Sequence, residues 1–247
     1  MKTQFFSFGL TLNWLVLTVF SFAPSVQAQL ISPPIVFKQP DPPPVGNPPD
    51  TSSGVDRNPC TESAIPFSAI APTDPTFWAI TVEESPEFWF YVPYTPEQIE
   101  SATLKLLDEE GNVLERKSVQ VTGTPGIVRL PSPTPLVRDR VYLAQFSLDF
   151  YCSETSPLET KFVRVNAMKR ELPTALAEQL TQADTLEEKA ILYAESGFWY
   201  DVLMAIAQLE GEKATTGREQ LFGSVGLADF SALPLTQCCF PVESMAE

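Results

Sequence analysis

The segment Pro86-Glu87-Phe88-Trp89-Phe90-Tyr91-Val92-Pro93-Tyr94 is the most informative part of this sequence about the fold. Successive side chains of a β-strand point to opposite faces of its sheet. Phe88, Phe90 and Val92 therefore share one face, and the two aromatic residues between them share the other. Because both faces are apolar, the pattern predicts a central strand that is covered on both sides.

Around this stretch, residues 60–167 have the pattern of short strands joined by turns. Glu110-Gly111-Asn112 is a turn signal between two alternating segments, which favours a hairpin with a return strand from Val113 to Val121. Alternation recurs from Tyr142 to Phe150. We therefore predict an antiparallel β-sandwich of immunoglobulin-like type with about seven strands.

The apolar period becomes helical after about Pro173. Thr185 stands three residues before Glu188, which is the pattern of a capping box at a helix start. Gly197 can take the left-handed conformation that ends a helix. The spacing predicts a helical hairpin within an acidic helical segment over residues 168–232, and an α+β fold class for the whole chain.

Both ends of the chain have a different character. Lys2, an apolar run and Val26-Gln27-Ala28 are typical of a secretory signal peptide over residues 1–28. Residues 29–59 hold nine prolines and predict a disordered, semi-rigid spacer. Residues 233–247 are expected to form a loose tail. No second long apolar run follows, so no membrane span is expected after cleavage.

The composition excludes several classes of function. The chain of 247 residues has 31 Asp and Glu, 16 Lys and Arg, and no histidine. A net charge of −15 argues against binding nucleic acid, which needs a basic face. Without histidine, the Ser-His-Asp, Cys-His and common zinc sites are excluded. The negative charge is concentrated in residues 171–247, where 13 acidic and three basic residues give −10.

The four cysteines fit an oxidising compartment, and they allow three pairings. We favour a disulfide between Cys60 and Cys152, which would tie the start of the folded region to one of its last strands. Cys238 and Cys239 are adjacent, and three roles remain open for them: a vicinal disulfide, free thiols or a contact with a partner.

Three segments carry a resemblance to a known family. They are Pro86 to Tyr94, Gly123-Thr124-Pro125-Gly126-Ile127-Val128, and the run from Tyr193 to Leu203. In this order, with a cysteine-containing strand between the second and the third, they resemble the cyanobacterial domain of unknown function 928 family over about residues 60–230. The resemblance implies an exported protein and brings no established activity or catalytic residue.

Aromatic residues are the candidate binding surface. The alternation of apolar faces favours a core role for them, but Trp and Tyr on an open sheet face could also stack on sugar rings. Trp199 and Tyr200 could dock the hairpin on the sandwich or form a groove for a partner. The candidate surface residues are Trp78, Trp89, Tyr91, Trp199 and Tyr200.

Carboxylates are the remaining candidates. Glu83, Glu84 and Glu87 could serve glycoside hydrolysis, which needs two carboxylates at a fixed separation. Asp108 to Asn112 could hold Ca²⁺, although a solvated hairpin tip is the simpler interpretation. Ser224 lies in Gly-Ser-x-Gly, which is not the nucleophile-elbow pattern. We predict no catalytic residue, no metal site and no cofactor.

The leading hypothesis is therefore a non-catalytic interaction or structural module of the periplasm, cell surface or extracellular space. Its partner would be an envelope protein or a polysaccharide, and not a nucleic acid. The alternative hypothesis is a carbohydrate-binding module that uses the sheet aromatics. A third and less favoured hypothesis is a hydrolase that uses carboxylates alone.

Overall fold

A computed structural model describes residues 33–40, 60, 64–72, 74, 77–236 and 239–241. The predicted signal peptide lies outside the described residues, as do Cys238 and most of the predicted spacer.

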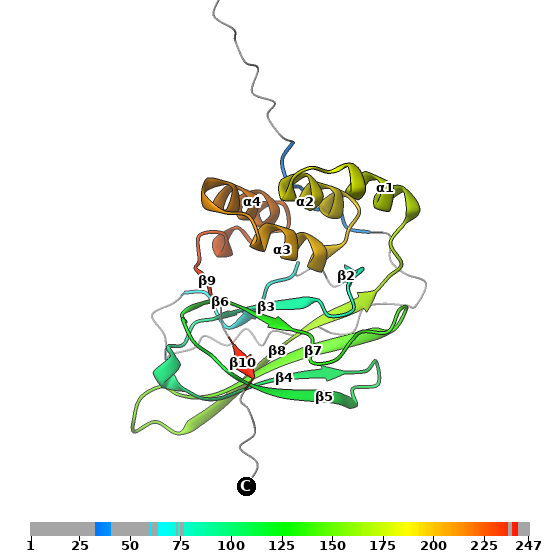
Figure 1. Cartoon of the computed structure of the whole chain (residues 1–247). Coiled ribbons are helices and arrows are strands. Elements are labelled where there is room, and N and C mark those ends of the chain that lie inside the picture. The colour runs from blue at the N-terminus through cyan, green and yellow to red at the C-terminus, as the bar shows by residue number, and fades with distance from the viewer. Residues whose placement is uncertain are drawn as a thin grey trace, which may run out of the picture. The chain divides into compact units, whose positions relative to one another are not determined.

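The chain runs through a β-rich half into a helical half, and its last two short strands return to the sheets (Figure 1). The strands are β1 (Ser68–Ala69), β2 (Ile80–Thr81), β3 (Glu87–Val92), β4 (Ile99–Leu107), β5 (Val113–Gln120), β6 (Gly126–Pro131), β7 (Val141–Tyr151), β8 (Leu158–Lys169), β9 (Leu235–Thr236) and β10 (Phe240–Pro241). The helices are α1 (Thr174–Gln182), α2 (Leu186–Glu195), α3 (Trp199–Ala207) and α4 (Gly211–Ser224), with 3-10 turns η1 (Pro96–Gln98) and η2 (Ala228–Phe230).

The strands form two sheets. One has four strands in the order β1-β3-β6-β9, and the other has six in the order β10-β5-β4-β7-β8-β2. Most neighbours are antiparallel, while β2 pairs with β8 and β9 pairs with β6 in parallel. The predicted α+β class is confirmed, and the predicted hairpin is the β4–β5 pair. An immunoglobulin-like arrangement stays a prediction.

The aromatic segment that begins at Pro86 forms β3, and this strand lies between two layers. Phe88 to Val92 are all buried. The ring of Phe90 lies 5.0 Å from that of Phe146 in the six-stranded sheet. On the opposite face, Tyr91 lies 5.9 Å from Phe230 in η2. Figure 1 shows the helices on one side of β3 and the six-stranded sheet on the other. The prediction of a strand covered on both sides is confirmed.

Helix α2 begins as its sequence predicts. The hydroxyl of Thr185 accepts a bond from the Glu188 amide, and the Glu188 carboxylate accepts one from the Thr185 amide, which completes the capping box. Gly197, at φ +78°, joins α2 to α3 and makes the predicted helical hairpin. Among the described residues, no helix has the length and apolar character needed to span a bilayer.

The structure differs from the sequence prediction at both ends of the folded part. Residues 33–40, inside the predicted disordered spacer, pack on the helices and bury Ile35 and Phe37. Residues 235–236 and 240–241, inside the predicted loose tail, pair with β6 and β5. Such short segments are fixed by long-range contacts, which a local sequence pattern does not reveal.

Candidate functional site

The aromatic residues predicted as a binding surface are all buried, so that prediction is wrong. The exposed fraction of each side chain is 2% or less for Trp78, Trp89, Tyr91, Trp199 and Tyr200. A sugar ring needs an open face for stacking, and none of these five rings offers one. The hypothesis of a carbohydrate platform built from these sheet aromatics fails on the same observation.

These aromatic residues instead fasten the helices to the sheets, as the core interpretation predicted. The indole N–H of Trp199 donates to the carbonyl of Ile70 at 3.1 Å. The Trp199 ring meets Phe37 and Phe77 edge-on at 5.1 and 5.8 Å. Tyr200 donates its hydroxyl to a backbone carbonyl of β8. Helix α3 is therefore positioned by hydrogen bonds from the polar atoms of two buried aromatic side chains.

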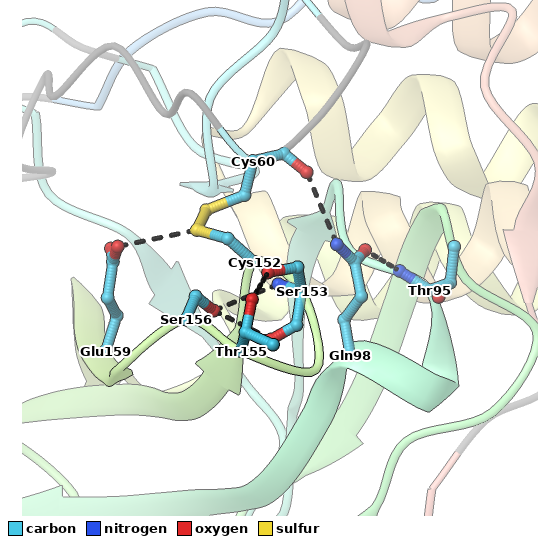
Figure 2. The surroundings of a disulfide bond; sticks show 8 residues. All are labelled: Cys60, Thr95, Gln98, Cys152, Ser153, Thr155, Ser156 and Glu159. Atoms are coloured by element: carbon cyan, nitrogen blue, oxygen red, sulfur yellow. Dashed lines mark hydrogen bonds between the residues drawn. A yellow bond between two sulfur atoms is a disulfide. The ribbon is translucent and has the colours of Figure 1, made fainter.

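The predicted disulfide between Cys60 and Cys152 is confirmed, and Figure 2 shows its surroundings. The side-chain amide of Gln98 donates to the Cys60 carbonyl at 3.3 Å and accepts from the Thr95 amide at 3.0 Å. Glu159 lies 3.4 Å from the Cys152 sulfur. These two sulfurs form a disulfide, so the group Cys60, Cys152 and Glu159 offers no thiolate for a metal. Cys239 is also disulfide-bonded.

The glutamates proposed for hydrolysis do not converge. Glu84 forms an ion pair with Lys169 at 2.7 Å, and Glu87 pairs with Arg129 at 3.6 Å. Glu83 lies at a cleft with a volume of about 220 Å³ between α2, α3 and the segment after β2, and neither Glu84 nor Glu87 lines this cleft. The Ser224 hydroxyl accepts from the Phe37 amide and donates to the Leu221 carbonyl.

The turn after β4 is held by its own hydrogen bonds. The carboxylate of Asp108 accepts bonds from both the backbone and the side-chain amide of Asn112. Gly111 supplies the positive φ, at +86°. These bonds account for Asp108 as part of the hairpin tip.

Asp201 is a buried carboxyl at the floor of the Glu83 cleft, and sequence analysis missed it. Its side chain accepts from the Val82 amide at 3.2 Å and is bonded to the Thr81 hydroxyl. Burial raises its pKa from 3.8 to about 7, although the Thr81 and Val82 bonds act in the opposite direction. Burial and the charges of Asp201 and Glu83 also raise the pKa of Tyr193. Because Asp201 is only 3% exposed, it acts as a joint between β2 and α3.

The outer face of the six-stranded sheet carries many polar side chains, which the strand register brings together. Side chains that point to the four-stranded sheet are buried, such as Leu104, Phe146 and Val163. The alternate side chains, paired across β5, β4, β7 and β8, make up the outer face. Its polar and charged members are Ser101, Thr103, Lys105, Arg116, Ser118, Gln145, Ser147, Asp149, Thr160 and Arg164. The same alternation also places Leu107, Leu143, Tyr151, Leu158 and Phe162 on this face.

Three cations cross this outer face in one row. The register places Arg116 beside Lys105, Lys105 beside Gln145, and Gln145 beside Arg164. Neighbouring strands lie about 4.8 Å apart, so the row crosses about 14 Å. Within the described part of the chain, none of these three cations forms a salt bridge. The row is therefore a set of charges with no protein counter-ion in contact.

Neighbouring side chains fix the end of the row. The Arg164 Nε donates to Gln145 at 2.8 Å, and its guanidinium lies 4.9 Å from the centre of the Phe162 ring. Gln145 donates in turn to the Ser147 hydroxyl at 3.2 Å. Arg164 is thereby oriented before any ligand arrives, with its terminal nitrogens available as donors.

Asp149 is the one carboxylate of the outer face. It accepts bonds from the Ser101 and Thr160 hydroxyls, each at 2.6 Å, and these bonds lower its pKa. Asp149 is therefore ionised near neutral pH, and the outer face carries three positive charges against one negative charge. This balance is the reverse of the whole chain, which has 31 acidic and 16 basic residues.

Comparison with known proteins places the chain in a family. A family model described as a domain of unknown function, DUF928, matches residues 52–235. The chain belongs to this family, and the resemblance seen in its sequence is confirmed. Neither the curated proteins nor the solved structures contain a match to the chain.

Proposed function

We propose that this member of the DUF928 family is a non-catalytic binding module of an exported protein, and that its outer sheet face holds an acidic polysaccharide of the cell envelope. The cation row of Lys105, Arg116 and Arg164 is the observation that carries the proposal. An acidic protein that places three cations on one exposed face, without counter-ions in contact, has a face suited to a negatively charged ligand.

The chemistry of the outer face favours a sugar polymer over a protein. Protein interfaces are centred on apolar and aromatic anchors that become fully buried. The outer face has two large exposed apolar side chains on β8, Leu158 at 49% and Phe162 at 42%, and Phe162 already lies against Arg164. The side chains in and next to the cation row are hydroxyl, amide, guanidinium, ammonium and carboxylate groups. Such groups match the hydroxyls and carboxylates of an acidic sugar chain.

Several observations support an exported setting. The Cys60–Cys152 disulfide fits an oxidising compartment. The sequence of residues 1–28 predicts a signal peptide, and the described helices include no candidate membrane span. We place the protein in the periplasm or at the cell surface. A binding role, rather than catalysis, is supported by the separation of Glu84 and Glu87 into different ion pairs.

The test is calorimetric titration of the mature chain with polygalacturonate, using neutral dextran as the control polymer. Lys105→Gln combined with Arg116→Gln should weaken binding about tenfold, which corresponds to about 0.7 kcal/mol for each exposed charge contact. Lys117→Gln is the matched control. Lys117 lies on the same strand but pairs with inward-facing Leu104, so its removal should change affinity less than about twofold.

The possible outcomes distinguish an error about the binding surface from an error about the class of ligand. Absence of binding to any acidic polysaccharide, together with absence of a partner lost in the Lys105/Arg116 variant, would overturn the whole proposal. Capture of an acidic envelope protein that depends on the same two cations would keep the surface and replace the polysaccharide. An equal loss in the Lys117 variant would show that the outer face is not the site.

A further inference from the structure

The segment of residues 33–40, which we call the strap, contacts the helices in the way that an extended peptide ligand contacts its receptor. It lies outside the matched family domain of residues 52–235. Figure 1 shows it in blue beside the helices. Ile35 and Phe37 are buried at 1% and 8% exposure, while Val36 between them is 44% exposed. This alternation is how an extended peptide places every second side chain in its receptor.

The backbone of the strap is bound by the helices at three points. The Ile35 amide donates to Gln220 at 2.9 Å, and the Phe37 amide donates to Ser224 at 3.1 Å. The Lys38 amide donates to the Ala194 carbonyl at 2.9 Å. Outside the backbone, the Lys38 side chain pairs with Glu195 at 3.6 Å. The strap is thus attached to α2 and α4 by non-covalent bonds. The same bonds could form with a strap that belongs to another copy of the chain.

The helices provide close contact surfaces for the strap. A Cβ on Gly197 would come within 2.8 to 3.0 Å of three atoms of Pro40, so only glycine allows this approach. A Cβ on Gly217 would come within 3.4 Å of Ile35. Phe37 packs edge-on against Trp199 and Phe77. We call the surface made by Ala194, Gly197, Trp199, Gly217, Gln220 and Ser224 the strap site.

We propose that the strap site also accepts the strap of a second copy of this chain, so that two copies join by exchanging residues 33–40. The occupant is chemically the same in both arrangements, and every contact described above is reproduced between copies. Exchange of an identical element is a low-cost route to association.

Whether the strap binds its own chain or a second copy depends on the segment that tethers it to the folded domain. Residues 41–59 connect the strap to Cys60, and 19 residues of proline-rich sequence reach about 60 Å when extended. Short flexible linkers give effective concentrations on the order of millimolar, and we take this value as the scale for the strap of the same chain. The strap of the same chain therefore occupies the site in dilute solution. Exchange becomes dominant when copies gather at comparable local concentration, or when the site of one copy is blocked.

Two complementary variants test the exchange directly. Ile35→Asp with Phe37→Asp makes a chain whose strap cannot be buried and whose strap site is vacant. Gly197→Ala makes a chain with an intact strap and a blocked site. Mixed at about 100 µM each, they should form a one-to-one heterodimer in gel filtration with light scattering, because the intact strap of one variant can bind the vacant site of the other. This concentration is well below the effective concentration of a tethered strap, so chains with an intact strap and an open site should not exchange. Each variant alone should remain a monomer.

Gly226→Ala is the matched control. Gly226 has a positive φ of +76° like Gly197, but a Cβ there meets nothing within 4 Å. The change in φ preference is therefore similar, while the strap site is not blocked and keeps the strap of its own chain. Mixing this variant with the Ile35/Phe37 variant should give two monomers.

Near-UV circular dichroism establishes that each variant is folded before mixing. If Gly197→Ala does not fold, Gln220→Ala with Ser224→Ala replaces it, because these changes remove two acceptors for strap amides. Folded complementary variants that never form a heterodimer would overturn the proposal and leave the strap as an intramolecular element only. An equal amount of heterodimer with Gly226→Ala would also overturn it, because association would then use another surface.

Discussion

At the scale of single residues, Asp201 shows how burial changes the behaviour of an ordinary side chain. The carboxyl joins α3 to the end of β2 through Thr81 and Val82. Its pKa is about 7 in the folded chain and 3.8 in the reference state. Between these values the folded protein binds the Asp201 proton and the unfolded chain releases it. The stabilisation is present below about pH 4 and is lost as the pH rises towards 7.

We therefore expect the free energy of unfolding to include an Asp201 contribution that falls by up to about 1.4 kcal/mol per pH unit between pH 5 and 7. Asp201→Asn should remove this slope in urea unfolding curves measured across that range. Asp149→Asn is the control, since the pKa of Asp149 is lowered and its titration lies below the window. A slope that persists in Asp201→Asn would contradict the role of this carboxyl.

Other single residues explain why sequence alone could not locate the outer face. The alternation of Thr103 and Lys105 with buried leucines is visible in the sequence and predicts an exposed strand face. The position of Arg164 beside Gln145, and of Arg116 beside Lys105, depends on the register of three strand pairs. Register is set by packing between distant segments, so the cation row appears only in the structure.

At the scale of secondary structure elements, local sequence patterns correctly predicted the elements whose position depends on nearby residues. The two-sided apolar pattern placed β3 in the centre, and the Thr185 capping box placed the start of α2. The strap was missed because the prolines around Ile35 and Phe37 dominate the composition and predict a spacer. The same aromatic character that placed β3 in the core also suggested a binding surface, and burial decided between the two interpretations.

The disulfide is the element-scale feature with the largest expected effect on stability. It joins Cys60 to the residue directly after β7 and closes a separation of 92 residues. On the chain-entropy model, Cys60→Ala with Cys152→Ala should lower the free energy of unfolding by roughly 4–5 kcal/mol. Urea unfolding with and without dithiothreitol measures this effect. The reductant should destabilise the wild type strongly and change the double variant much less. An equal effect on both chains would assign the stabilisation to the disulfide of Cys239.

At the scale of the whole molecule, the charge distribution raises a question about the proposed ligand. A chain with a net charge of −15 should repel a polyanion at long range. Residues 171–247 carry −10 of this charge, and the helices lie on the side of β3 away from the six-stranded sheet (Figure 1). The outer face and the acidic helices are thus separated by the four-stranded sheet.

Screening by salt limits the range over which the acidic helices can repel the ligand. The Debye length is about 8 Å at 0.15 M salt and about 30 Å at 0.01 M. At 0.15 M, a polyanion at the outer face should respond to Lys105, Arg116 and Arg164 and not to the helices. Glu212→Gln with Glu219→Gln removes two exposed charges from α4. This change should leave polygalacturonate affinity within about twofold at 0.15 M and raise it at 0.01 M.

The Lys105/Arg116 variant should behave differently, because its charges contact the ligand. Its affinity should be lower than that of the wild type at both salt concentrations. If the α4 variant instead binds more tightly at 0.15 M, the polymer must approach the helices as well as the sheet. The bound polymer would then have to extend beyond the outer face, since charges farther than a Debye length are largely screened.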